Sequence, residues 1–107
     1  IINNPQIVEA GRIADKILPQ KAVVLAPYNG DTAFLYQINR RGFPVAILPV
    51  AEMVSDYGVT HYVSTTYDSK TMWATRHFKV LVETPNYVVV DLTQLILPLD
   101  DRLDPEP

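Results

Sequence analysis

The stretch "KAVVLAPYNGDTAFLYQINRRGF", residues 21–43, decides the fold that the sequence predicts. Its first part, residues 21–26, is a short, continuous, Val-rich run, which is typical of a strand buried on both faces of a parallel sheet. Residues 27–31 predict a turn, because Pro, Asn, Gly and Asp favour turn geometry. Residues 32–41 predict a helix. A strand, a turn and a helix in this order form the first part of a crossover between parallel strands.

Capping signals set the ends of this helix and of the one before it. Arg40 and Arg41 suit the negative end of a helix dipole, and Gly42 suits the left-handed position that ends a helix. Upstream, Asn4 is the expected N-cap and Pro5 the first residue of a helix that stops at the proline before the strand.

The alternation continues downstream of this stretch. The pattern predicts, in order, a strand at 44–48, a Pro-started and Gly-ended helix at 49–58, a strand at 59–65 and a helix at 68–78 that Asp68 caps. The segment "KVLVETPNYVVVDL", residues 79–92, has two Val-rich runs around a "TPN" turn, which indicates an antiparallel hairpin.

We therefore expect an α/β fold: a three-layer sandwich with a mainly parallel, Rossmann-like sheet of about five strands and a C-terminal antiparallel hairpin. The first three strands are expected in the order 2-1-3. Residues 1–99 are predicted to be a single domain, and residues 100–107 an acidic, flexible tail. The apolar run at 92–99, which includes Gln94–Leu99, is either a cover over the sheet edge or a docking surface for a partner or a membrane.

Composition excludes several classes of function. A net charge of -3 and a pI near 5.2 argue against a nucleic-acid partner. The absence of cysteine excludes disulfides, thiolate zinc sites and thiol nucleophiles. No apolar run reaches the roughly 20 residues of a membrane-spanning helix. Because the chain starts "IINNPQ" without Met, we expect it to be a piece of a longer protein.

Two polar loops are candidates for a ligand site, because ligands of open α/β sheets bind at the carboxyl ends of the strands. The candidate residues are Tyr28, Asn29, Asp31 and Thr32 after the first strand, and Thr65, Thr66, Tyr67 and Asp68 after the third. If these strands are neighbours, the loops share one crevice, and their side chains suit a sugar or nucleoside. The same residue types are also common in turns and helix caps, so a purely structural role stays open.

No catalytic, cofactor or metal site is predicted. His61 and His77 are the only histidines, and neither belongs to an HxH or HExxH spacing. The serines lack a GxSxG context, and the chain has neither GxGxxG nor GxxxxGK[ST].

The order of four segments is more specific than any single motif. They are "ILPQKAVVLAP" (17–27), "GDTAFLYQINRRGF" (30–43), "DYGVTHYVST" (56–65) and "FKVLVETPNYVVVDL" (78–92). This series resembles the soluble C-terminal domain of bacterial integral-membrane glycosyltransferases of the dolichyl-phosphate-mannose protein mannosyltransferase type, a superfamily that includes lipid A aminoarabinose transferases. The resemblance covers about residues 7–93. The matching positions are Pro19, Tyr36, Arg41, Gly42, Gly58, Tyr62, Val63, Tyr87 and Asp91, each with a structural explanation such as helix stop, core tyrosine or strand residue.

The resemblance implies a non-catalytic accessory domain on the extracytoplasmic, periplasmic side of a bacterial cell membrane. The parent enzyme would use a polyprenyl-phosphate sugar donor, with its catalytic acidic residues in loops of the transmembrane portion. The partners implied are that transmembrane portion and the sugar donor or acceptor. The alternative is a free-standing α/β domain that binds a nucleotide or a sugar through the two polar loops.

Overall fold

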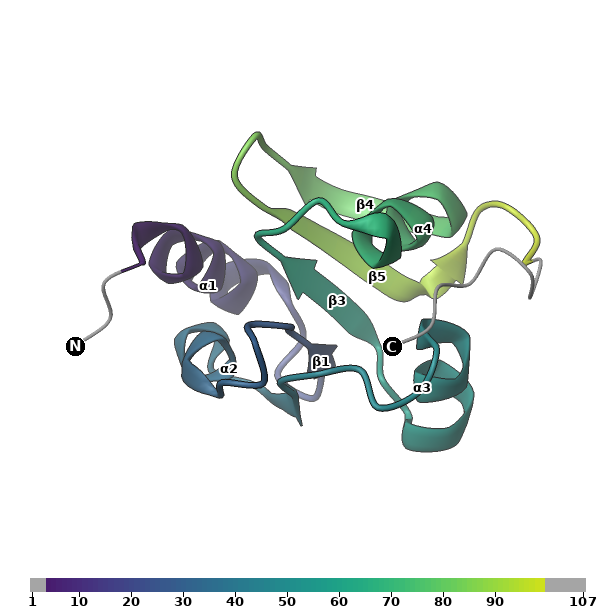
Figure 1. The fold of residues 1–107 in the computed structure, drawn as a ribbon, viewed down its shortest axis with the longest axis horizontal. Coiled ribbons are helices and arrows are strands. Elements are labelled where there is room, and N and C mark those ends of the chain that lie inside the picture. Colours follow the sequence, from purple (N-terminus) through teal and green to yellow (C-terminus); the bar gives the residue numbers. More distant parts are fainter. Residues whose placement is uncertain (1–3, 100–107) are drawn as a thin grey trace.

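A computed structural model of the chain describes residues 4–99 (Figure 1). Its elements, in chain order, are α1 (Pro5–Ile17), β1 (Val23–Leu25), α2 (Ala33–Ile38), β2 (Arg41–Phe43), α3 (Val50–Tyr57), β3 (His61–Ser64), α4 (Ser69–His77), β4 (Phe78–Glu83) and β5 (Val88–Leu95). Asn4 caps α1 as predicted, since its side chain accepts hydrogen bonds from the amides of Gln6 and Ile7. The predicted tail at 100–107 lies outside the described residues.

The five strands form one mixed sheet in the order β2-β1-β3-β5-β4 (Figure 1). The predicted order of the first three strands is confirmed. The prediction of a mainly parallel, Rossmann-like sandwich is wrong. β1 pairs in parallel with β2 over three residue pairs and with β3 over two, whereas β5 pairs antiparallel with β3 over four and with β4 over five.

The sheet is mostly antiparallel because β5 lies between β3 and β4. The connection from β3 to β4 contains α4 and is long enough for a crossover, so these two strands run in the same direction, but they are not paired with each other. β5 returns from the hairpin turn and pairs antiparallel with both of them. The hairpin thereby takes part in two of the four strand pairings, and not only at an edge.

The end of α2 also differs from the prediction. The helix stops at Ile38 because Asn39 adopts the left-handed conformation, with φ 61°, and its amide bonds to two carbonyl groups of the last turn. The strand predicted at 44–48 is therefore wrong, and Arg41–Phe43 forms β2 instead. Gly42 serves close strand approach and not a helix end, because an added Cβ would lie 1.8 Å from the carbonyl oxygen of Val24.

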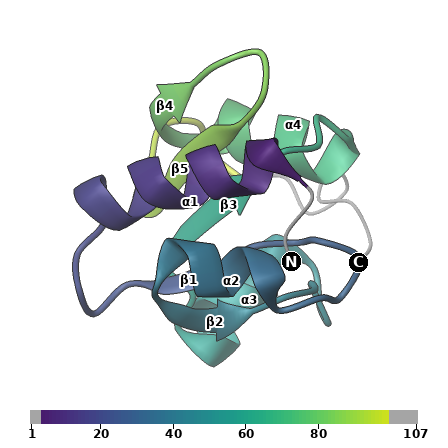
Figure 2. The same ribbon diagram turned by 90° about the vertical axis from the view of Figure 1, so that its left-hand side faces the viewer.

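Helices cover both faces of the sheet. α1 and α2 pack side by side on one face (Figure 2), around a core cluster that includes Val24 and Val63. α3 and α4 contribute to a second cluster that includes the next residue of β1, Leu25, and the preceding residue of β3, Tyr62. This alternation of side chains along each strand gives the two core layers. Within residues 4–99, no helix has the length and hydropathy that a membrane crossing needs.

The end of β5 and the residues after it lie against the end of α4 through backbone contacts. The amides of Ile96 and Leu97 bond to the carbonyl group of His77 at 2.8 and 3.3 Å. The side chains of Leu95, Ile96, Leu97 and Leu99 are exposed. The expectation that this segment packs as a cover over the sheet edge therefore does not hold for these side chains, and a docking role stays a prediction.

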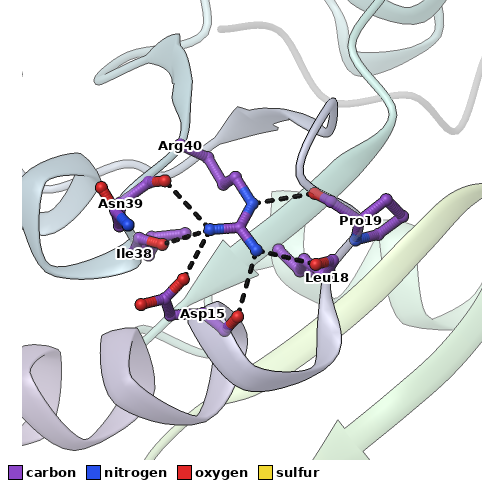
Figure 3. A network of polar contacts seen from close by, with 6 residues as sticks. All are labelled: Asp15, Leu18, Pro19, Ile38, Asn39 and Arg40. Carbon is purple, nitrogen blue, oxygen red and sulfur yellow. Dashed lines mark hydrogen bonds and ion pairs between the residues drawn. The ribbon is translucent and has the colours of Figure 1, made fainter.

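A buried arginine joins the first two helices (Figure 3). The side chain of Arg40, which the sequence placed at the negative end of a helix dipole, is only 1% exposed. Its guanidinium group donates to the Asp15 carboxylate at 2.6 Å and to the carbonyl groups of Asp15, Leu18, Pro19, Ile38 and Asn39 at 2.7–3.3 Å. These carbonyl groups lie at or near the carboxyl ends of α1 and α2, where helices leave carbonyl groups without intrahelical partners.

We predict that Arg40→Met lowers the free energy of unfolding by about 3 kcal/mol, because it leaves several buried carbonyl groups without donors. Asp15→Asn is the matched variant, since it removes only the partner charge. The side chain of Asp15 is 40% exposed, so this change should cost about 1 kcal/mol or less. Urea denaturation of both variants measures the difference. Equal losses would mean that the ion pair, and not the carbonyl contacts, holds the two helices.

Candidate functional site

A cavity of about 300 Å³ lies between the two predicted loops, at the carboxyl ends of β1 and β3. We call it the loop cavity. It is lined by Asn4, Gln6, Pro27, Tyr28, Asn29, Ser64, Thr65, Thr66 and Asp68. The two loops therefore meet, as expected for neighbouring parallel strands.

Five of the eight candidate residues line the loop cavity: Tyr28, Asn29, Thr65, Thr66 and Asp68. The other three lie elsewhere. The carboxylate of Asp31 accepts a hydrogen bond from the Ala33 amide at the start of α2, which is the structural role that sequence left open. Thr32 faces a separate hollow beside α2. The hydroxyl group of Tyr67 lies 2.5 and 2.9 Å from the carbonyl oxygens of Thr84 and Tyr87, at the hairpin turn.

The β1–α2 loop takes its shape from a tight turn. Asn29 and Gly30 both have positive φ, at 53° and 76°, and the Asp31 amide bonds to the Tyr28 carbonyl at 2.9 Å. Two consecutive left-handed residues inside such a hydrogen bond define a type I′ turn, for which Asn-Gly is a preferred pair. The turn exposes the Asn29 side chain at the cavity edge.

The β3–α4 loop is fixed by hydrogen bonds within the chain. Ser64 Oγ donates to the Thr66 carbonyl at 2.9 Å and accepts from the Thr66 amide at 3.0 Å. The Thr71 hydroxyl also donates to the Thr66 carbonyl, at 2.7 Å, and lies 2.8 Å from the hydroxyl of Tyr62. Burial raises the pKa of Tyr62 to about 12, against the opposing effect of the Thr71 hydrogen bond, so this hydroxyl stays protonated at neutral pH.

Sequence reasoning missed the wall of the loop cavity that α1 provides. Asn4 Nδ2 donates to the Tyr28 hydroxyl at 3.4 Å, and Gln6 Nε2 donates to Asn86 Oδ1 at 3.3 Å. The helix cap at Asn4 was recognised, but its position beside the loops depends on how α1 packs on the sheet. Nothing within the N-terminal segment itself indicates that contact.

The groups lining the loop cavity suit a neutral polar ligand. They offer amide and hydroxyl groups, which form hydrogen bonds in both directions. The carboxylate of Asp68 caps α4 by accepting from the Thr71 amide at 2.9 Å, and its charge disfavours an anion in the same space. No histidine lines the cavity, so its described lining has no nucleophile–base pair of the Ser–His kind.

A second polar cluster, at the opposite end of β3, was not predicted. Thr60 Oγ1 lies 2.8 Å from His61 Nδ1, and His61 Nε2 lies 3.6 Å from Asp91 Oδ1 on β5. His61 and Asp91 are directly opposite each other in the antiparallel register. Both are buried and line a cavity of about 470 Å³. The pairing of His61 with Asp91 depends on the register between β3 and β5, and the sequence of each strand alone does not show that register.

The surroundings of this pair shift both pKa values downward. Burial lowers the pKa of His61, and the negative charge of Asp91 only partly opposes that effect. Burial alone would raise the pKa of Asp91, but hydrogen bonds from Thr93 and Gln94 outweigh it. Those bonds are 2.6–2.9 Å long and use both carboxylate oxygens. The pair is therefore a neutral imidazole beside an ionised, hydrogen-bonded carboxylate at neutral pH.

No group of three or more His, Cys, Asp or Glu residues within 4–99 could hold a metal ion. Comparison of the chain with family models, with curated proteins and with solved structures gives no match.

We predict that stability falls as the pH drops below about 6.5, the ordinary pKa of histidine, because the unfolded chain protonates His61 more readily than the folded chain does. Hydrogen bonds from Thr93 and Gln94 hold the pKa of Asp91 below the ordinary value of an aspartate, so its contribution is lost only at more acidic pH. Urea denaturation between pH 7.5 and pH 5 should give a flatter stability profile for His61→Gln than for the wild type. An equally steep profile for the variant would contradict this assignment.

Proposed function

We propose that the chain is a non-catalytic, extracytoplasmic domain of a polytopic bacterial membrane glycosyltransferase that uses a polyprenyl-phosphate sugar donor. The observation that carries this proposal is the ordered resemblance over about residues 7–93. In enzymes of this type the catalytic residues belong to the transmembrane portion, so no position of this chain is assigned a catalytic role. The domain would cover the active-site face or help to position the acceptor.

The roles of the matching positions support the proposal. Gly42 allows β2 to approach β1, and Gly58 ends α3 in the left-handed conformation with φ 70°. Tyr62 and Tyr87 are buried in the two core clusters. Proteins that share a domain are expected to keep the residues that its fold needs, and these matching positions have such roles.

We predict that the gene segment upstream of the Ile1 codon encodes several apolar spans of roughly 20 residues, with acidic residues in the first extracytoplasmic loop. Deletion of the domain from that parent protein should lower sugar transfer from a polyprenyl-phosphate donor, measured in membranes at equal protein levels. A start codon or signal peptide directly upstream, or full activity and stability without the domain, would overturn the proposal.

The convergence of the two loops favours a second candidate function, a small-molecule binding domain for a nucleoside or a sugar, the neutral polar ligands that suit the loop cavity. The loop cavity is formed by amide, hydroxyl and aromatic groups from α1 and from both loops. Asn29 and Thr65 have side chains at the cavity without a hydrogen-bond partner among residues 4–99, so both are available to a ligand.

We predict that a panel of nucleosides, nucleotides and sugars contains a ligand of the loop cavity. Binding of that ligand raises the melting temperature of the chain. Asn29→Gly keeps the left-handed turn, and Thr65→Val keeps the side-chain shape. Each should weaken binding about three- to tenfold, the effect of one lost hydrogen bond. Thr75→Val, on the exposed part of α4, is the control. Absence of any shift across the panel would remove this candidate.

A further inference from the structure

The cavity of about 470 Å³ that His61 and Asp91 line differs from the loop cavity in having apolar walls. We call it the His61 cavity. Its buried polar groups are His61 and Asp91, and Lys21 is exposed at its rim. Apolar side chains from α1, from the α1–β1 connection and from β4 form the walls: Ile17, Pro19, Ala22 and Leu81. Apolar walls around a few convergent polar groups are typical of small-molecule sites.

His61 brings an unpaired ring nitrogen to this cavity. Its Nδ1 lies 2.8 Å from Thr60 Oγ1, but its Nε2 lies 3.6 Å from Asp91 Oδ1, beyond hydrogen-bonding distance. Asp91 Oδ1 already accepts from the amide and the hydroxyl of Thr93. Nε2 therefore has no hydrogen bond within residues 4–99, although His61 is only 4% exposed. The nearby negative charge favours the tautomer with a proton on Nε2, so this atom is a donor that a ligand can use.

The Thr60 hydroxyl allows the His61 ring to become charged without losing a hydrogen bond. Thr60 Oγ1 accepts from the Val23 amide at 3.0 Å and also lies 3.3 Å from the Val23 carbonyl oxygen. While the imidazole is neutral, the hydroxyl donates to Nδ1. When Nδ1 is protonated, it donates to Thr60 Oγ1, and the hydroxyl donates to the Val23 carbonyl oxygen instead.

Two charged groups of the cavity lining face the imidazole: Asp91 on β5 and Lys21 in the α1–β1 connection. The lining residues from α1 and β4 are apolar, and Lys79 of β4 lies opposite Asp91 in the register without lining the cavity. Burial keeps His61 neutral against the effect of Asp91, because it lowers the pKa of the ring. A second carboxylate at Nε2 would shift this balance toward the charged ring.

These groups restrict the ligand to an anion with an apolar body. Within residues 4–99 the Lys21 ammonium group has no hydrogen-bond or ion-pair partner, so it and Nε2 of His61 offer two donors to one acceptor group. The walls favour a hydrocarbon part. With His61 protonated, the two cations balance Asp91 and one further negative charge. A carboxylate meets this condition, whereas a phosphate dianion leaves an excess negative charge beside Asp91.

We propose that the His61 cavity binds a small apolar carboxylic acid as its anion, together with one proton from the solvent. The carboxylate lies between Lys21 and Nε2 of His61, and the hydrocarbon part lies against Ile17 and Leu81. The proton adds to Nδ1 of His61, and no covalent bond of the ligand changes. The proposal depends neither on a parent transferase nor on a ligand of the loop cavity.

The test is titration of the 107-residue chain with hexanoate, hexanamide, hexylamine, acetate and inorganic phosphate, followed by two-dimensional NMR between about pH 6 and 8, where a carboxylic acid is ionised. Hexanoate should bind about tenfold or more tightly than any other member of the panel. Its affinity should rise as the pH falls, by up to about tenfold per pH unit, because the complex holds one more proton. The ring signals of His61 should shift toward those of an imidazolium on binding, with His77, the only other histidine, as the internal reference.

Three variants separate the two cations from general charge effects. His61→Gln should weaken hexanoate binding about tenfold at pH 6 and remove its pH dependence. Lys21→Gln should weaken binding about three- to tenfold and keep the pH dependence. Lys16→Gln is the matched control, since it removes an exposed charge from the last turn of α1 outside the cavity lining, and it should leave the affinity unchanged.

Four results would overturn the proposal. They are the absence of hexanoate binding, equal affinity for hexanoate and hexanamide, equal affinity for hexanoate and acetate, and an affinity for hexanoate that does not change with pH. The first three use the wild-type chain and one pH, so they decide the question even if His61→Gln does not fold. None of them depends on sugar transfer, so failure here is distinct from failure of the proposed function.

Discussion

The buried guanidinium group of Arg40 is the contact on which one half of the molecule depends. Carbonyl groups at or near the carboxyl ends of α1 and α2 accept hydrogen bonds from Arg40. Such groups destabilise a fold when they are buried without donors. A planar cation with five N–H donors satisfies them from a single side chain. This contact joins the carboxyl end of α2 to that of α1, and the shared core cluster holds the rest of the two helices together.

The polar groups of the loop cavity divide into two kinds. Ser64 and Asp68 hold the β3–α4 loop in place, so their hydrogen-bonding capacity is largely used to shape the backbone. The side chains of Asn29 and Thr65 have no hydrogen-bond partner among residues 4–99. A loop that is already held in place and carries such side chains favours recognition without reorganisation on binding.

Local signals predicted the local features of the fold. Asn4, Pro5 and Gly58 mark helix ends by their own conformational preferences, and the "TPN" turn marks the hairpin. The mostly antiparallel pairing of the sheet was not predictable in this way. The sequence does not show that β5 lies between β3 and β4, because this placement depends on packing. The role of Arg40 was missed for the same reason, since its acceptors on Asp15, Leu18 and Pro19 are 21–25 residues away in sequence. For the candidate site, the two loops were predictable from strand ends, whereas the contributions of Asn4 and Gln6 depend on how α1 packs on the sheet.

The central position of β3 has a consequence for how the molecule opens. All four residues of this strand are buried, and it is paired with β1 on one side and β5 on the other. The parallel portion, built from residues 5–43, pairs with His61 and Tyr62, and β5 of the hairpin portion pairs with all four residues of the strand. Separation of either portion exposes one edge of β3 and its buried side chains, so we expect the amide protons of β3 to be among the slowest to exchange with solvent.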